Sequence, residues 1–361
     1  MRRCTLLGIA MLCALIAPVV LAGPVRAAGD RAGTRSVAAS PYSTYAIERD
    51  GSLWTWGDVF PARLGSGATR NYRLPHRIGT GTSWAALAVG HDHCLALKRD
   101  GSLWAWGDNN RCQLGLGPSA GRPQPKPVRV GASLWRSISA GFWFSVAVRR
   151  DGSLWSWGST AGGELGNGSD GTLRRRVGTD ADWRTATTGS GYVLALKTGG
   201  SLWGWGANQL GQLGIGAADQ LSHPVTRVGG DSDWTAIAAG GSFNLALKTD
   251  GSLWAWGDNH AGQLGLGDTV SRYVPTQVGT GTDWKAVATG NTSGYALKQD
   301  GSLWAWGGNA SGQLGLGDRT QRLVPTRVGS ATSWTRVAGG GPDAFAIRGD
   351  HSLWGWGKNN L

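Results

Sequence analysis

The chain has 361 residues, with 35 basic and 23 acidic side chains, 61 glycines and 21 tryptophans. The glycines follow no three-residue period, which excludes a collagen-like fibre, and the length alone would accommodate two average domains. The formal net charge of +12 favours anionic partners at long range.

Residues 1–27 are predicted to be a secretory signal peptide. A basic pair precedes an apolar run, and small residues at Ala22 and Ala27 offer two cleavage sites. The mature protein is therefore expected to be secreted, periplasmic or part of the cell envelope, with residues 28–361 as one domain. An uncleaved membrane anchor is the alternative, because the apolar run is near the lower length limit for spanning a membrane. No later stretch is long and apolar enough to span a membrane.

The hexapeptide Ser-Leu-Trp-x-Trp-Gly occurs seven times at steps of 48 to 51 residues, which indicates a repeat architecture. In the copy from Trp84 to Gly131, two β-rich runs flank Asp100-Gly101, a strong hairpin signal. A Gly-rich loop then leads to a fourth run at Pro127, and proline suits the start or edge of a strand. The pattern predicts an all-β fold, a seven-bladed β-propeller built from four-stranded repeats of about 50 residues.

Twenty of the tryptophans belong to this pattern, fourteen in the hexapeptides and six at the start of the first strand. They are predicted to fill the space between blades, where burying each side chain contributes about 2–3 kcal/mol. The last copy ends before its fourth strand, and the segment 24–27 resembles Pro127 to Val130. Cleavage after Ala22 is therefore expected to leave an N-terminal segment that completes the last blade.

Three recurring motifs resemble the regulator of chromosome condensation repeat family over residues 34–361. They are Gly90-x-x-His93-x-x-Ala96-Leu97, Asp100-Gly101-x-Leu103-x-x-Trp106-Gly107 and the loop from Gly262 to Gly267. The resemblance implies a seven-bladed propeller. It also implies two alternative functions: guanine-nucleotide exchange on a small GTPase, or inhibition of a secreted hydrolase, as in the distantly similar second β-lactamase inhibitory protein of secreted bacterial type. The signal peptide, and the lack of an inserted wedge between blades, count against exchange.

The loop that joins the first two strands of each repeat varies, whereas its frame stays constant. In a propeller these loops should gather on one face, and Trp143 in one of them is the single tryptophan outside the repeat pattern. Aromatic side chains on a rim favour binding, although local packing between blades is the alternative. We predict a face that binds another macromolecule, in first place a protein. Its predicted contacts are Phe142, Trp143, Phe144, Tyr42, His91, Asp92, His93, Tyr192 and Phe243.

No catalytic residues, cofactor or metal site are predicted. The loop His91-Asp92-His93 has two histidines and one carboxylate but no further ligand. The segment from Gly166 to Gly171 fits a dinucleotide fingerprint without the required strand–turn–helix context. A non-catalytic monomer is expected, with a polysaccharide-binding or carbohydrate-active propeller as a further alternative.

Basic residues recur at two repeat positions and should form rings. The favoured interpretation is that their stems cover apolar surface at strand ends, and binding to an anionic polymer is the alternative. The one local cluster, Arg174 to Arg176, lacks an aromatic-basic motif for nucleic acid, which is therefore not favoured. Cys94 and Cys112 form an even pair that a disulfide could join in an oxidising compartment.

Overall fold

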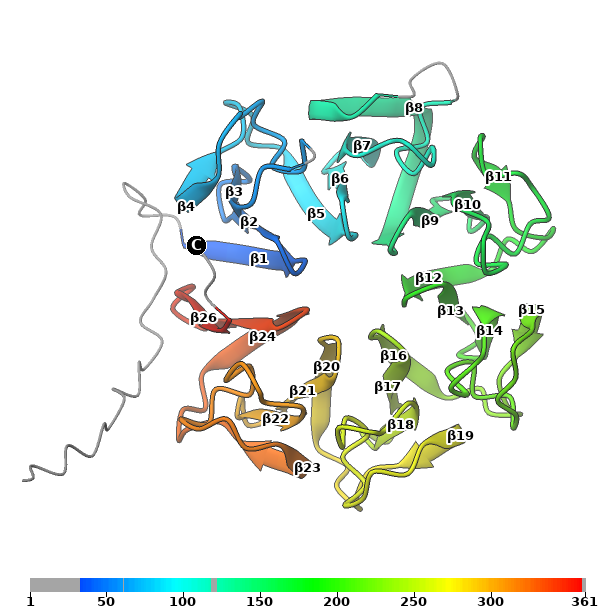
Figure 1. The fold of residues 1–361 in the computed structure, drawn as a ribbon, viewed down its shortest axis with the longest axis vertical. Coiled ribbons are helices and arrows are strands. Elements are labelled where there is room, and N and C mark those ends of the chain that lie inside the picture. The colour runs from blue at the N-terminus through cyan, green and yellow to red at the C-terminus, as the bar shows by residue number, and fades with distance from the viewer. Residues whose placement is uncertain (1–32, 61, 118–121, 359–361) are drawn as a thin grey trace, which may run out of the picture.

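The computed structural model describes residues 33–60, 62–117 and 122–358, and these residues form strands, turns and loops without a helix. The predicted signal peptide and the segment 24–27 lie outside the described residues. The described strands form antiparallel sheets arranged around a central axis (Figure 1). The predicted all-β propeller of seven repeated blades is confirmed.

Within each blade the strands follow chain order from the centre outward (Figure 1). The first three blades contain β1 (Thr34–Ala39), β2 (Ser43–Glu48), β3 (Leu53–Gly57), β4 (Tyr72–Arg77); β5 (Trp84–Val89), β6 (His93–Lys98), β7 (Ser102–Gly107), β8 (Gln124–Ala140); and β9 (Phe144–Arg149), β10 (Leu154–Gly158), β11 (Arg175–Arg176). The long β8 pairs first with β7 and then with β9, so one strand is the outer strand of blade 2 and the inner strand of blade 3.

The remaining blades are separate sheets. They contain β12 (Trp183–Thr188), β13 (Tyr192–Lys197), β14 (Leu202–Ala207), β15 (Ser222–Arg227); β16 (Trp234–Ala239), β17 (Phe243–Lys248), β18 (Leu253–Gly257), β19 (Arg272–Gln277); β20 (Trp284–Thr289), β21 (Ser293–Lys298), β22 (Leu303–Gly307), β23 (Arg322–Arg327); and β24 (Trp334–Gly340), β25 (Asp343–Arg348), β26 (Leu353–Gly357). In the described part of the chain the seventh blade thus has three strands.

The hexapeptide and the Asp-Gly turn before it form one hydrogen-bonded unit. In blade 2 the Asp100 carboxylate accepts bonds from the backbone N–H and the hydroxyl of Ser102, at 2.8 and 2.7 Å. The Ser102 hydroxyl in turn accepts the indole N–H of Trp104 at 3.0 Å, and all seven blades repeat this bond at 2.8–3.0 Å. Because the side chains fix the turn from within, its sequence recurs almost unchanged.

The second tryptophan of the hexapeptide connects adjacent blades. The indole N–H of Trp106 donates to the carbonyl of Arg63 in the Gly-rich loop of blade 1, at 3.0 Å. Five further blades repeat the bond, so that six such bonds span 2.7–3.1 Å. A Cβ atom on Gly265, in the same loop of blade 5, would lie 2.8 Å from the indole of Trp306. Glycine is therefore required where the loop approaches the next blade.

Replacing Gly265 by Ala should destabilise the protein more than replacing Gly279. Both glycines have positive φ, at 73° and 61°, but nothing lies within 4 Å of a Cβ atom on Gly279. The Gly279→Ala variant measures the cost of the left-handed backbone, about 1–2 kcal/mol, and Gly265→Ala adds about 1–3 kcal/mol of overpacking. Urea unfolding of both variants tests this, and equal losses would contradict the close contact.

The first ring of basic residues lies over tryptophans. The Nζ atom of Lys98 is 5.0 Å from the ring centre of Trp84 and 3.9 Å from that of Trp104, and five other blades repeat the arrangement. In blade 1 the paired positions hold Thr34 and Glu48, and the hydroxyl donates to the carboxylate at 3.0 Å. The charges of this ring therefore stabilise the blades by cation–π attraction.

The second ring of basic residues caps backbone carbonyls. Arg77, Arg227 and Arg327 each donate to a carbonyl in the link that follows their own strand, at 3.3, 2.7 and 3.0 Å. The interpretation that these rings have a structural role thus accounts for both of them.

The two described cysteines are free, and the disulfide that the sequence left open is not formed. Cys94 on β6 is fully buried with Tyr45 and Trp106 in the core between blades 1 and 2. Cys112 lies in the Gly-rich loop of blade 2, where burial and the charge of Asp170 in blade 3 raise the pKa of its thiol. The two thiols face different neighbouring blades.

Cys112 also has a φ of 59°, at a repeat position that holds glycine in other copies. Cys112→Gly should therefore stabilise the protein by about 1 kcal/mol, because glycine adopts this backbone without steric cost. Thermal unfolding measures the gain. Cys112→Ala removes the thiol but keeps the strain, and an equal gain in that variant would assign the effect to the thiol.

Candidate binding face

The loops that join the first and second strands gather around the central opening, as predicted. They line a cavity of about 640 Å³ to which all seven blades contribute, from Ser40 and Tyr42 in blade 1 to Pro342 in blade 7. Neighbouring loops are also bonded to each other, for example by the N–H of Ser190 to the carbonyl of Gly241 at 3.0 Å. The cavity therefore has a wall of backbone that is held from blade to blade.

Four rings from three adjacent loops form a continuous row, which we call the aromatic arc: Tyr42, His91, Phe142 and Trp143. The centre of the His91 ring lies 5.3 Å from that of Tyr42, edge to face, and 4.0 Å from that of Phe142, stacked. Phe142 meets Trp143 edge to face at 4.6 Å. Tyr42, Phe142 and Trp143 remain 44%, 38% and 40% exposed, so the arc presents apolar surface to solvent.

A charged network supports the arc from behind. Asp92 accepts a bond from the guanidinium of Arg63 at 2.8 Å and from Nδ1 of His91 at 2.7 Å. Burial raises the pKa of Asp92, but the hydrogen bond from His91 and the charge of Arg63 outweigh burial, so the pKa lies below its usual range. The Arg63 guanidinium also lies 4.7 Å from the Tyr42 ring centre. This network holds the rings of blades 1 and 2 in place.

Sequence reasoning missed Arg63, although a signal for it existed. The residue stands where other copies have the glutamine of Gln-Leu-Gly, whose side chain accepts a bond within its own loop, as Gln263 does from the N–H of Ala261 at 2.8 Å. An arginine cannot accept that bond, and here it contacts Asp92 and Tyr42 instead. Arg111, whose guanidinium lies 5.8 Å from the Trp143 ring centre, was missed as well.

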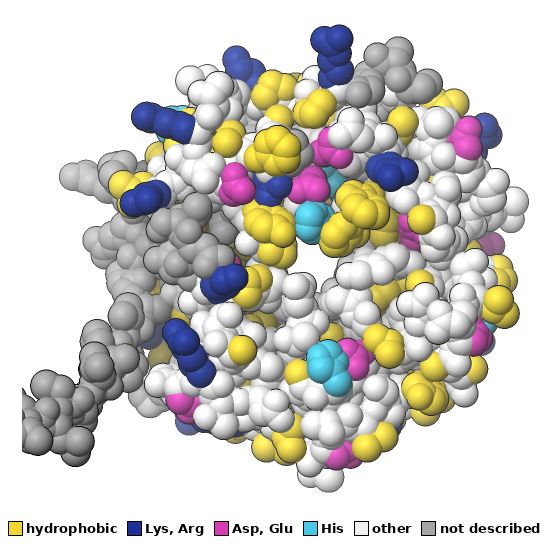
Figure 2. All heavy atoms as spheres, in the orientation of Figure 1, with side chains coloured by type: hydrophobic (Ala, Val, Ile, Leu, Met, Phe, Trp, Pro, Cys, Tyr) yellow, Lys and Arg dark blue, Asp and Glu magenta, His cyan; other side chains and the backbone are white. Residues whose placement is uncertain are grey.

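The face is asymmetric. Figure 2 shows hydrophobic, acidic, basic and histidine side chains gathered beside the central opening over blades 1–3. The corresponding loops of blades 4–7 have small or polar residues, among them Ser190, Gly241, Asn291 and Pro342. The candidate binding surface is therefore one sector of the ring.

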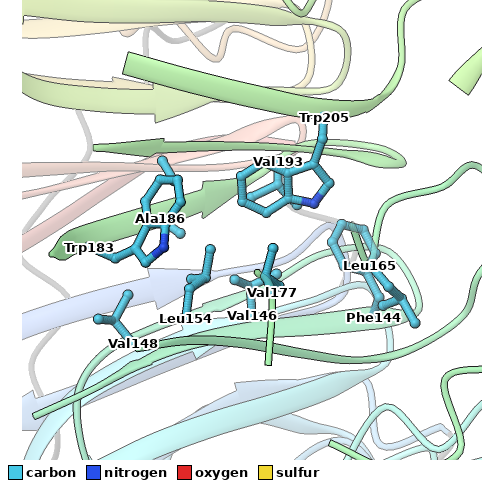
Figure 3. Packing of buried hydrophobic residues seen from close by; sticks show 11 residues of the cluster. Phe144, Val146, Val148, Leu154, Leu165, Val177, Trp183, Ala186, Val193 and Trp205 are labelled. Atoms are coloured by element: carbon cyan, nitrogen blue, oxygen red, sulfur yellow. The ribbon is translucent and has the colours of Figure 1, made fainter. Parts of the chain in front are cut away.

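Four predicted contacts lie in the core, and their assignment to the surface is wrong. Phe144 packs with Leu165 of its own blade and Trp205 of the next (Figure 3). Each of the four begins the second strand of its blade, and its side chain points between blades, whereas Phe142 and Trp143 lie in the loop before that strand. The buried residues are His93, Phe144, Tyr192 and Phe243.

Two ionisable residues at this repeat position, one buried and one half-buried, have opposite pKa shifts. His93, whose Nε2 lies 2.8 Å from the Ser145 hydroxyl, has its pKa lowered to about 4 by burial. Asp343 in blade 7 has its pKa raised to about 7 by burial. His93 therefore costs stability as the pH falls from 6.5 to about 4, because the unfolded chain binds the proton more tightly. Asp343 costs stability as the pH rises from about 4 to 7.

His93→Phe, which introduces the residue of blades 3 and 5, should remove the acid sensitivity. Relative to wild type, its unfolding free energy should gain on the order of 2–3 kcal/mol between pH 7.5 and 4.5. Asp343→Ser should show the reverse trend, with a larger gain at pH 7.5. Urea unfolding at both pH values measures this, and pH-independent differences would count against the two buried titrations.

Within the ranges that the structure describes, no three histidine, cysteine or acidic side chains are placed to hold a metal ion. The same ranges contain no helix long and apolar enough to cross a bilayer.

The fold is a β-propeller of tryptophan-rich repeats, and the exposed side chains of the aromatic arc gather on one sector of one face. The family model described as Regulator of chromosome condensation (RCC1) repeat matches residues 50–97, 100–148, 199–247, 250–297 and 300–347, more than half of the chain. The chain belongs to the regulator of chromosome condensation repeat family, whose members are mostly non-enzymatic, protein-binding regulators.

Similar proteins of known sequence include the ultraviolet-B receptor UVR8 of Arabidopsis thaliana. It is 31% identical over 230 residues, 62% of this chain and 52% of the receptor. The probable E3 ubiquitin-protein ligase HERC3 of Homo sapiens is 32% identical over 138 residues, 38% of this chain and 9% of the ligase. The chain thus spans about half of the first protein and a small part of the second.

Two solved structures share the fold at low identity. Prp20p from Saccharomyces cerevisiae superposes with a TM-score of 0.77 at 23% identity, over 90% of this chain and 82% of that one. Human WBSCR16 gives a TM-score of 0.76 at 21% identity, over 85% and 89% of the two chains. These similarities show the architecture.

Proposed function

We propose that this chain is a secreted, non-catalytic propeller that binds a protein partner, as a monomer, through the aromatic arc. The observation that carries the proposal is the row of four touching rings across three loops, three of them more than a third exposed. Exposed rings of this kind are the side chains that most often dominate protein interfaces.

The arc is suited to binding because it is organised before a partner arrives. The Arg63–Asp92–His91 network fixes two of the loops, and the backbone bond from His91 to Gly141 at 3.3 Å joins the second loop to the third. Rings that are already ordered lose little side-chain entropy when a partner covers them. The proposal of secretion is supported separately, by the signal-like first 27 residues.

Nucleotide exchange on a small GTPase is the second candidate. Prp20p, whose fold this chain shares, is described as binding Gsp1p and histones. The discriminating measurement is the rate at which the protein releases bound nucleotide from a small GTPase. Inhibition of a secreted hydrolase would be one form of the first proposal, with stoichiometric loss of enzyme activity on titration. Retention on a polysaccharide column would indicate a carbohydrate ligand instead.

Trp143→Ala should weaken partner binding by about 2 kcal/mol, roughly thirtyfold, because truncation of an interface anchor has this effect. The matched control is Tyr273→Ala, which removes a ring that is 46% exposed on the outer strand β19. A pull-down from the secreted fraction identifies the partner, and calorimetry with each variant measures the affinity. Equal affinity of the Trp143 variant and wild type would remove the arc from the interface.

A further inference from the structure

The charged side chains that line the central cavity are of one sign, positive. Of the described residues that line it, Lys358 and His91 are the ones with basic side chains, and none has a carboxylate. The rest of the lining is mostly glycine and small residues, together with the rings of Tyr42 and Phe142. The volume of about 640 Å³ lies within the range of about 300–1,000 Å³ that is usual for ligand pockets.

Lys358 stands at the repeat position after the hexapeptide, where three other copies have an aspartate. It follows the hexapeptide of blade 7, and its N–H bonds to the carbonyl of Pro342 at 3.3 Å, as the N–H of Asp108 does to Asp92 at 2.8 Å. The aspartates at this position are engaged in their own loops: Asp108 accepts a bond from Gln113 at 2.8 Å and Asp258 from Gln263 at 3.0 Å. The side chain of Lys358 is exposed at the cavity instead.

The carboxyl group next to Lys358 belongs to Asp343. Asp343 interacts electrostatically with Lys358, and burial raises the pKa of Asp343 to about 7. In blade 2, beyond blade 1, Asp92 is already bonded to Arg63 and His91. Arg111 adds a further cation next to Trp143. The described lining of the cavity therefore combines apolar rings with the cation of Lys358 and has no carboxylate of its own.

We propose that the cavity receives a carboxylate from a projecting loop of the protein partner, with Lys358 as its cation and the aromatic arc covering the apolar residues beside it. The inference rests on the proposed function and specifies the chemistry of the partner. A free anion would leave the arc uncovered, and a flat partner surface would leave the cavity unfilled. A loop with an acidic residue flanked by apolar ones both fills the cavity and covers the arc.

The test uses a phage-displayed library of disulfide-closed twelve-residue loops, selected on the immobilised protein. Selected loops should carry Asp or Glu next to an apolar residue. A synthetic peptide of the selected sequence should bind Lys358→Glu at least tenfold more weakly, and exchanging its acidic residue for Lys should restore binding to that variant. Such a charge exchange separates a direct pair from a general change in affinity.

The matched control is Arg319→Glu, which makes the same charge change at an exposed residue outside the cavity and should alter affinity less than twofold. Near-UV circular dichroism checks that each variant is folded. Selected loops without acidic residues, or acidic loops that bind Lys358→Glu as tightly as wild type, would overturn the inference. If those loops still lose binding to Trp143→Ala, the proposed function stands, and if they do not, it fails as well.

Discussion

The bond from the second indole of the hexapeptide to a carbonyl of the preceding blade is the interaction on which the propeller depends. It satisfies a buried N–H and a loop carbonyl together, and leaving either unpaired would cost about 1–3 kcal/mol. It also fixes the distance between blades, because the ring rests on the glycine two residues beyond the carbonyl, as Trp306 does on Gly265. Repeated six times among the described residues, this contact turns separate four-stranded sheets, which are marginal alone, into one ring.

Such a frame makes the loops on the binding face independent of the fold. The first-to-second-strand loops begin and end at backbone positions that the frame already holds, so their side chains can change without loss of blade packing. The Gly-rich loop of blade 1 also departs from the repeat, because Arg63 gives up the internal bond of the repeat glutamine and supports Tyr42 and Asp92 instead. The corresponding loops of blades 2 to 6 keep the internal bond. Departure from the repeat is therefore what distinguishes the candidate site from the scaffold.

The sequence allowed the fold to be predicted because the period, the Asp-Gly turns and the tryptophans all point to the same structure. It also located part of the site, since Phe142 and Trp143 have no counterpart in the repeat. Phe144 was misassigned because it was grouped with its neighbours in the chain, although strand alternation and its counterparts Tyr192 and Phe243 indicate a repeated core position. Arg63 and Lys358 were missed because each departs from the repeat singly, and their meaning emerges only when blades 1 and 7 are placed around one cavity.

The net charge of the chain is a poor guide to what the face recognises. Most of its regularly placed cations are committed to the frame, with Lys98 and its counterparts over indole rings and Arg227 and its counterparts on backbone carbonyls. Among the cations outside these two rings, Lys358 lines the cavity and Arg111 lies beside the arc. Selectivity for an acidic partner would then come from these two positions and the rings between them, at short range, where salt screens the attraction least.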